Sequence, residues 1–321
     1  MTRRASRQGN GNNERADVYT RITSRIVQDL EKGVRTWMQP WSTEHAAGRI
    51  TRPLRANGQA YRGINIVMLW ASAIEQGFAA PIWMTYRQAQ ELGGQVVKGA
   101  QGSLVVYADR IRRIERNEST GEDESREIPF MKGYTVFNVE QIEGLPGHLY
   151  GKAEPVAAGQ GPERIEAAEA FFRALGADIR HGGNRAYYAH GSDHVQMPPF
   201  ESFEEAQGYY AVLAHECVHW TKHESRLDRD LGRKRWGDEG YAREELVAEL
   251  GSAFLACDLG IALEPREDHA AYIASWLKVL KDDKRAIFGA ASLAQAAVDY
   301  LHGRQDRDEG QGEDGEAMMA A

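Results

Sequence analysis

The sequence predicts an α+β protein with two domains, and three observations support this fold class. The chain has 321 residues, 42% of them hydrophobic, which is enough for two domains of ordinary size. Residues 1–98 contain 14 basic and 7 acidic side chains, although the whole chain has a formal net charge of −8. A stretch rich in Gly, Ala and Pro, residues 147–162, follows this basic region. We therefore expect one domain at 17–146 and a second at 163–303, joined by a linker at 147–162.

The two ends of the chain are predicted to be disordered. Residues 1–16 are polar and rich in Arg, Gly and Asn, and residues 304–321 are polar and acidic. The N-terminal stretch lacks the apolar segment of a secretory signal, and no apolar run approaches the length needed to span a bilayer. The chain has two cysteines, Cys217 and Cys257, so no disulfide framework is expected. These features are typical of a cytoplasmic protein without membrane contact.

The first half is expected to alternate helices with short strands. Helical periodicity begins at Asp17, a plausible N-cap, and two further helices are predicted over 64–76 and 86–92, the latter capped by Thr85. The β-branched and aromatic runs 104–107 and 134–139 predict a pair of strands. The charged residues 109–129 between them predict a mobile extension of the hairpin.

Aromatic and basic side chains are interleaved in this first half. Proteins that bind single-stranded nucleic acid without sequence preference use this combination, because cations pair with phosphates and aromatic faces stack on bases. The candidate DNA contacts are Trp37, Trp41, Arg52, Arg55, Tyr61, Arg62 and Lys98. The competing interpretation is core packing, which we expect for Trp70 and Trp83 and which remains equally open for Trp37 and Trp41.

Several linked motifs cover residues 17–146: Trp37-x-x-Pro40-Trp41, Tyr61-Arg62-Gly63-Ile64-Asn65, Trp83-x-Thr85 and Val136-Phe137-Asn138-Val139. Together they resemble the N-terminal domain of ArdC-type antirestriction proteins, which also begins some plasmid primases. The resemblance implies sequence-independent binding of DNA, preferentially single-stranded, with double-stranded DNA as a second partner. It also implies antirestriction, the shielding of incoming plasmid DNA from host restriction enzymes during conjugation.

The strongest chemical signal is the apolar run 210–220, which contains His215-Glu216-x-x-His219. A helix has 3.6 residues per turn, so His215 and His219 project from one face and can converge on one metal ion. Glu216 lies about 100° further round the helix, where a base could take a proton from a metal-bound water. The pattern predicts Zn²⁺, with another divalent ion such as Mn²⁺ as the alternative. The competing interpretation is a buried helix with two core histidines.

A third metal ligand is expected from residues 242–259, a predicted helix that is apolar nearly all round and therefore buried. It carries Glu245 and Glu249 one turn apart, and burying two lone carboxylates would be costly. Coordination by one of them and a hydrogen bond to a ligating histidine from the other would remove that cost. Glu244, at the start of the helix, is expected to face solvent. The alternative is a salt-bridged surface pair with basic residues of the loop 226–235.

The motifs His215-Glu216-x-x-His219, Arg226-Leu227-x-Arg229 and Glu244-Glu245-Leu246-Val247-Ala248-Glu249 are similar to the metallopeptidase-like domain of the ArdC family. They also resemble the gluzincin class of zinc peptidases. The resemblance implies a zincin-like metallopeptidase domain with Glu245 as third ligand, Glu249 orienting His215 or His219, and Glu216 as catalytic base.

The activity of this predicted metal site stays open, and its protein substrate is unknown. One alternative function is that of a DNA-dependent metalloprotease that cleaves DNA-bound proteins, as the Spartan/SprT class does. That class uses a histidine as its third ligand, and the sequence offers no clear position for one. A second alternative is a fold in which the metal is only structural, with no open coordination position.

Overall fold

The computed structural model describes residues 10–35, 37, 52–116, 123–150, 165–232, 238–261 and 269–305. Its N-terminal half contains α1 (Asn10–Glu31), β1 (Leu54–Arg55), α2 (Ile64–Gln76), β2 (Ile82–Met84), α3 (Tyr86–Glu91), β3 (Gln95–Val96), β4 (Ser103–Arg116), β5 (Asp123–Asn138) and β6 (Ile142–Glu143). Its C-terminal half contains α4 (Glu166–Ala174), β7 (Asp178–His181), β8 (Tyr187–Ala189), β9 (His194–Met197), α5 (Ala206–Trp220), α6 (Glu239–Leu259), α7 (His269–Asp282) and α8 (Ala286–His302). This mixture of helices and sheets is the predicted α+β class.

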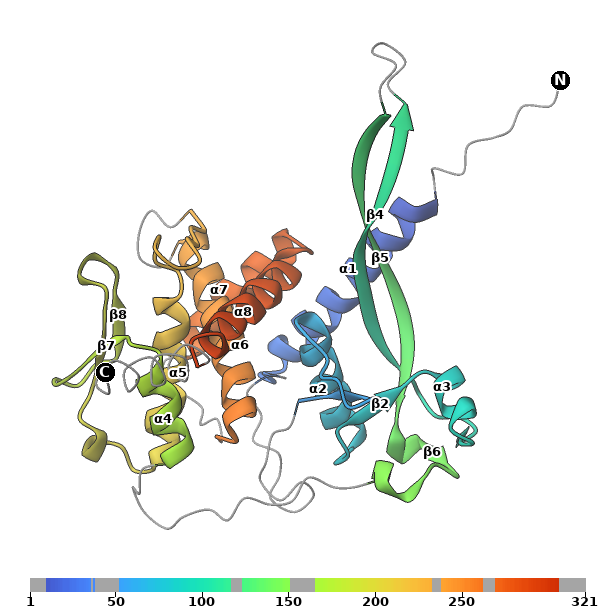
Figure 1. Ribbon diagram of the computed structural model, residues 1–321, viewed down its shortest axis with the longest axis horizontal. Helices are drawn as coiled ribbons and strands as arrows, with labels where there is room; N and C mark the ends of the chain where they lie inside the picture. Colours follow the sequence, from blue (N-terminus) through green and yellow to red (C-terminus); the bar gives the residue numbers. More distant parts are fainter. Residues whose placement is uncertain are drawn as a thin grey trace, which may run out of the picture.

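The N-terminal half is built around a long hairpin of β4 and β5. The strands pair from Ser103↔Val136 to Arg116↔Asp123, so the charged residues 109–116 and 123–129 continue the ladder that the apolar runs begin. Residues 117–122 of the predicted extension lie outside the described part. Figure 1 shows this hairpin projecting from the rest of the molecule, with α1 beside it. The sheet order is β1-β2-β5-β4. The predicted helix 64–76 is confirmed, and the Thr85 hydroxyl caps α3 by accepting a hydrogen bond from the Gln88 amide.

Two predicted boundaries in this half differ from the structure. Helix α1 begins at Asn10 rather than at Asp17. Extending a helix that has already formed costs far less than nucleating one, so polar residues can add turns in front of the apolar stretch. Residues 147–150, expected in the linker, form a 3₁₀ turn in which Leu149 is buried against Ile142 and Leu145. Residues 1–9, 151–164 and 306–321 lie outside the described part, as does most of the predicted linker.

The described part of the C-terminal half combines a small sheet with the α-helices α4 to α8. Its strand order is β7-β9-β8, with β9 parallel to β7 and antiparallel to β8. Strands β8 and β9 follow one another in the chain and pair directly, whereas the sequence gives no signal for β7. Strand β7 is exposed along most of its length, so it lacks the apolar alternation that marks a strand in a sequence.

The main hydrophobic core extends through both halves, and a smaller cluster that includes Met84, Ile142 and Leu149 lies in the N-terminal half. Trp37 packs edge-on against Trp276, with ring centroids 6.1 Å apart, and Trp70 packs against Phe254 at 6.0 Å. Polar contacts cross the same boundary, because the Thr23 hydroxyl donates to the Lys284 carbonyl at 2.7 Å. In Figure 1, α1 lies between the hairpin and the helices α7 and α8.

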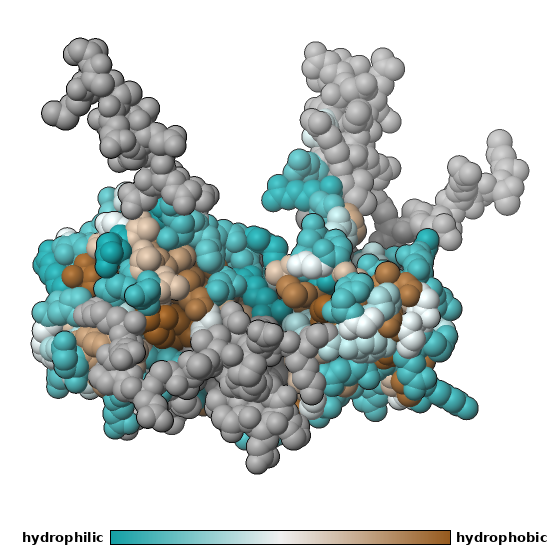
Figure 2. Space-filling view, turned by 60° about the horizontal axis from the view of Figure 1, so that its bottom comes forward, coloured by the Kyte–Doolittle hydropathy of each residue, from teal (hydrophilic) through white to brown (hydrophobic). Residues whose placement is uncertain are grey.

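The face of the described residues that Figure 2 shows carries both hydrophilic and hydrophobic side chains. In the view of Figure 2, apolar areas are visible on both halves and are bordered by hydrophilic side chains. None of the helices in the described ranges combines the length and the apolar character that a bilayer crossing requires.

Candidate metal centre

Helix α5 carries the two predicted histidine ligands into the interior. It is buried along nearly its whole length, because apolar residues flank the histidines on every side of the helix. The exposed fractions of His215, Glu216 and His219 are 4%, 4% and 7%. The two imidazole rings lie one turn apart, with centroids separated by 4.9 Å. The predicted convergence of the rings is therefore present.

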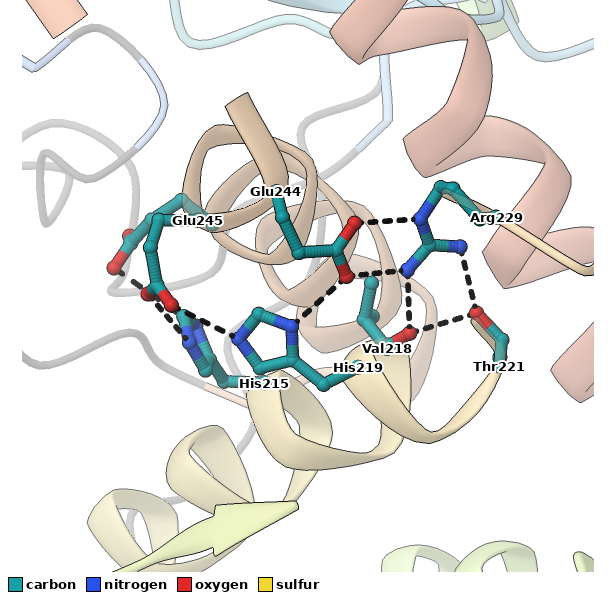
Figure 3. Close-up of polar contacts among 8 residues, drawn as sticks. His215, Val218, His219, Thr221, Arg229, Glu244 and Glu245 are labelled. Atoms are coloured by element: carbon teal, nitrogen blue, oxygen red, sulfur yellow. Dashed lines mark hydrogen bonds and ion pairs between the residues drawn. The ribbon is translucent and has the colours of Figure 1, made fainter. Parts of the chain in front are cut away.

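Helix α6 packs closely on α5 and brings Glu245 to both histidines (Figure 3). Glu245 Oε2 lies 3.6 Å from His215 Nε2, and Glu245 Oε1 lies 3.5 Å from His219 Nε2. A tetrahedral zinc ion with bonds of about 2.1 Å places its ligand atoms about 3.4 Å apart. Among the described residues, these three form a cluster whose ligand atoms all lie within 4.8 Å of one another. Two imidazole nitrogens and one carboxylate thus fit a divalent metal ion.

The other ring nitrogens of the two histidines face carboxylates. His219 Nδ1 lies 3.0 Å from Glu244 Oε1, a hydrogen-bond distance. His215 Nδ1 lies 3.8 Å from Glu249 Oε1, close enough for an electrostatic contact but too long for a good hydrogen bond. Carboxylates at Nδ1 direct the Nε2 lone pairs towards a metal and increase the basicity of the rings. Glu249 therefore lies where it can orient His215.

Glu244 does not face solvent, which corrects the sequence-based expectation. Its exposed fraction is 5%, and Arg229 grips its carboxylate with Nε and Nη2, each at 2.8 Å (Figure 3). Arg229 also donates to the Thr221 hydroxyl and to the Val218 carbonyl, both at 3.0 Å. The missed signal was the helix itself, because a helix that is buried all round also buries the acids in its middle, here Glu244, Glu245 and Glu249.

Burial and charge act in opposite directions on these groups. Burial favours the neutral acid at Glu244, but hydrogen bonds from Arg229 and His219 lower its pKa to about 2. Burial likewise opposes the charge on Glu245, and the two histidines nevertheless lower its pKa. Burial disfavours a charged His219, yet Glu245 and Glu244 raise its pKa to about 9. The carboxylates thus make the centre electronegative, so it favours a positive charge beside the histidines. A protonated histidine or a bound divalent ion would supply this charge.

Cys217 lies inside the metal-binding motif but two residues from each histidine, so it is on the opposite side of the helix and is a core residue. Burial raises the pKa of its thiol, and the charge of Glu216 raises it further. The thiol is therefore protonated at neutral pH and is a poor nucleophile or metal ligand.

Arg35, just after α1 in the N-terminal half, interacts electrostatically with Glu249 of the metal centre. Burial lowers the pKa of Arg35, and the negative charge of Glu249 acts in the opposite direction. Within the described part of the chain, Arg35 Nη1 is buried without a hydrogen-bond partner. This electrostatic interaction has no signal in the sequence, because it joins residues more than two hundred positions apart.

The aromatic candidates for DNA stacking lie mostly in the core. Trp37 and Tyr61 are only 1% and 7% exposed, so neither ring offers a free face to a base. For Trp37 the structure favours core packing, the competing interpretation. Trp70 and Trp83 are buried as predicted. Trp41 lies outside the described residues.

The basic candidates divide into two groups. Arg52 donates to Asp258 Oδ2 at 2.7 Å and to Gln295, and Arg62 forms an ion pair with Asp299, so both join the two halves. Arg55 and Lys98 remain exposed on the N-terminal half. Two of the four basic side chains predicted to bind phosphates, Arg52 and Arg62, therefore form contacts between the halves instead.

Comparison with known proteins covers both halves. Residues 16–137 match the family model of the N-terminal domain of anti-restriction factor ArdC, and residues 166–293 match that of a zincin-like metallopeptidase. Protein y4eC of Sinorhizobium fredii is 48% identical over 294 residues, which cover 90% of this chain and 92% of that protein. A DNA primase TraC of Escherichia coli is 38% identical over 88% of this chain, but the matched region is only 27% of the primase.

Solved structures extend the similarity to the whole fold. The metal-free crystal structure of the antirestriction ArdC protein from plasmid R388 is 47% identical, with a TM-score of 0.76, and the match covers 91% of this chain and 98% of that one. Its Mn(II)-bound structure is 46% identical, with a TM-score of 0.75, covering 90% and 98%. The Mn(II)-bound relative, the zincin-like domain and the converging ligands together indicate a divalent metal cofactor. The chain belongs to the ArdC family of antirestriction proteins.

Proposed function

We propose that this protein shields incoming plasmid DNA from host restriction enzymes during conjugation by binding the DNA without sequence specificity. The preferred ligand in this proposal is single-stranded DNA, with duplex DNA as a weaker one. Membership of the ArdC family and the ArdC N-terminal domain at 16–137 support it. The excess of basic side chains in residues 1–98 supports a polyanionic ligand for this half.

We further propose that His215, His219 and Glu245 hold Zn²⁺ or Mn²⁺. The observation that carries this proposal is the convergence of their ligand atoms within 4.8 Å in a buried site. The carboxylates behind the two rings add support, because they fix the ring orientation that coordination needs. When bound, the ion would supply Lewis-acid activation of a water molecule and of a peptide carbonyl.

The residues of the chain have separate tasks in peptide hydrolysis. Glu216 would accept the proton of the attacking water and return it to the leaving amine. Arg229 fixes Glu244, and Glu244 holds His219, so the ring cannot rotate away from the centre. Strand β8 is an edge of the β7-β9-β8 sheet and contacts α5, so its free side could hold an extended peptide by backbone pairing.

A second function uses the same residues. A DNA-dependent metalloprotease would cleave proteins bound to the DNA that the N-terminal half holds. Among the described residues the cluster offers three protein ligands, so a tetrahedral ion would keep one position open, which favours an enzymatic centre over a merely structural metal. The two functions differ in one respect, because coating of DNA does not require Glu216 and proteolysis does.

Replacement of Glu216 by Gln separates the two functions, since it removes the base and keeps the shape of the side chain. Glu224→Gln, an exposed residue just beyond α5, is the matched control. Plasmid transfer into a restricting recipient, cleavage of casein with and without oligonucleotide, and metal content would be measured for each protein.

If coating alone protects the plasmid, Glu216→Gln protects it fully. If proteolysis is required, the variant loses cleavage and protection while keeping its metal and its affinity for DNA. A wild-type protein that neither binds DNA nor improves plasmid transfer would refute the proposed function.

A further inference from the structure

The hairpin has two unlike faces near its base. Residues directly opposite one another in an antiparallel pair project to the same side. The pairs Val105↔Tyr134, Tyr107↔Lys132 and Asp109↔Phe130 therefore share one face. On this face Tyr107 and Tyr134 are 48% and 38% exposed, whereas Val105 is buried.

The opposite face has a structural role. Leu104, Val106 and Met131 are partly buried against the shared core, and Val18 of α1 lies close to Gly133. Packing on this side attaches the hairpin to the molecule together with Val105 and Val136, which lie at the base of the tyrosine face and are buried in the same core. The exposed tyrosines on the other side make no such contribution, so core packing does not account for them.

Cations accompany the exposed tyrosines. Lys132 Nζ lies 5.1 Å from the centre of the Tyr134 ring. Strand pairing places Arg55 opposite Trp83 and Trp83 opposite Asn138, so Arg55 projects on the side of the sheet that carries Tyr134. The Arg55 guanidinium lies 5.4 Å from the centre of the Tyr61 ring, and its charge has a small electrostatic effect on the Tyr107 hydroxyl.

The ring of Tyr107 is held in place. Its hydroxyl donates to Asp109 Oδ2 at 2.7 Å, and its ring contacts Phe130 with centroids 5.9 Å apart. Diagonal neighbours on a sheet, such as Tyr107 and Tyr134, are separated by roughly 7–8 Å, which lets each ring take its own base. Asp109 lies next to Tyr107 on the same face, further from the base of the hairpin. Its negative charge would repel phosphates, so we take it as the outer edge of this face.

We propose that this face, defined by Arg55, Tyr107, Lys132 and Tyr134, binds single-stranded nucleic acid. Unpaired bases stack on the two tyrosines, and phosphates pair with the lysine and the arginine. Bases in a duplex are stacked on one another and cannot reach the rings, so the face selects single strands. The inference rests on the proposed DNA-binding function and adds the location of the site, which lies outside most of the residues suggested by the sequence.

The test uses the full chain and a fluorescein-labelled (dT)20, with binding followed by anisotropy over a range of salt concentrations. The double variant Tyr107→Ala/Tyr134→Ala should raise the Kd at least tenfold, since loss of each stacked base costs about fivefold or more. The variant Tyr107→Phe/Tyr134→Phe keeps both rings and should bind within about twofold of wild type. Lys132→Ala should lower the slope of log Kd against log salt by about 0.7.

Tyr86→Ala and Arg87→Ala are the matched controls, because both side chains are exposed on α3 of the same half. Both should bind as wild type does. If the tyrosine-to-alanine variant has a lower melting temperature than wild type, Lys132→Glu is used instead. Charge reversal at this exposed residue should weaken DNA binding without removing a packed ring.

The possible outcomes distinguish the location of the site from the proposed DNA-binding function itself. If wild type binds (dT)20 and the double alanine variant binds equally well, the face is not the site, although DNA binding stands. If wild type does not bind (dT)20 even at low salt, DNA binding fails and the site fails with it.

Discussion

A buried ion pair between Arg229 and Glu244 holds the imidazole of His219 in the metal centre. Replacing Arg229 with Ala would leave the Glu244 carboxylate buried and without its main partner. We expect a loss of about 3–5 kcal/mol in the free energy of unfolding, measured by urea denaturation at pH 7. Arg243→Ala, which breaks an exposed pair with Glu239, should cost less than about 1 kcal/mol.

The same substitution should change how stability depends on pH. Hydrogen bonds lower the folded-state pKa of Glu244 from its ordinary value of 4.5 to about 2. Its stabilising contribution is therefore complete above pH 4.5 and is lost as the pH falls through 2. Without Arg229 this pKa rises, so the variant should lose less stability than wild type between pH 5 and 2. Equal losses in both proteins would show that Glu244 does not depend on Arg229.

At the scale of the element, the approach of α6 to α5 depends on Gly251. A Cβ at this position would lie 2.8 Å and 2.9 Å from the two methyl carbons of Val218, a fully buried residue with no room to move. Gly251→Ala should therefore destabilise the protein by about 1–3 kcal/mol despite the better helix propensity of alanine. It should also weaken metal binding, because α6 carries Glu245.

Gly289 in α8 provides the control for this prediction. A Cβ there would meet nothing within 4 Å, so Gly289→Ala should stabilise the protein by about 0.5–1 kcal/mol. Both variants can be compared by thermal melting, and metal content can be measured after dialysis. A stabilising Gly251→Ala would show that the two helices can separate at little cost.

The sequence predicted those parts of the site that depend on local periodicity. His215, Glu216 and His219 follow from the helical repeat, and the buried helix predicts an acidic ligand at Glu245 or Glu249. The choice of Glu245 came from the resemblance to the gluzincin class. Arg229 could not be placed in this way. Arg229 lies in the loop after α5. Asp228, just before it, adopts a left-handed conformation with φ 45°, and this turn brings Arg229 back to the C-terminal end of the helix, where it donates to the Val218 carbonyl.

The fold shows the same division between local and long-range information. The helix at 64–76 and the cap at Thr85 are local features and were predicted, as was the pairing of the hairpin strands. Trp37 and Arg52 were candidate DNA contacts because the first half is rich in aromatic and basic residues. Their partners in the structure lie more than two hundred residues away in the sequence, where local patterns cannot reveal them. Tertiary packing decided their positions.

At the scale of the whole molecule, the shared core makes the two halves one cooperative unit. Buried rings from both halves are in contact, and separating the halves would expose Trp37, Trp70 and Phe254 to water. We therefore expect a single calorimetric transition in which the calorimetric and van't Hoff enthalpies agree. Independent halves would instead give two transitions.

Substitutions in either half test this directly. Trp276 is fully buried, contacts Trp37 and donates its indole N–H to the Ala242 carbonyl at 3.1 Å, so Trp276→Ala should cost about 3–5 kcal/mol. Val136→Ala removes buried methyl groups from the N-terminal half. If the core is shared, both variants move the same single transition to lower temperature. A second peak, or a Trp276→Ala variant in which part of the heat absorption stays at the wild-type temperature, would mean that the contact between the halves adds little to the stability of either.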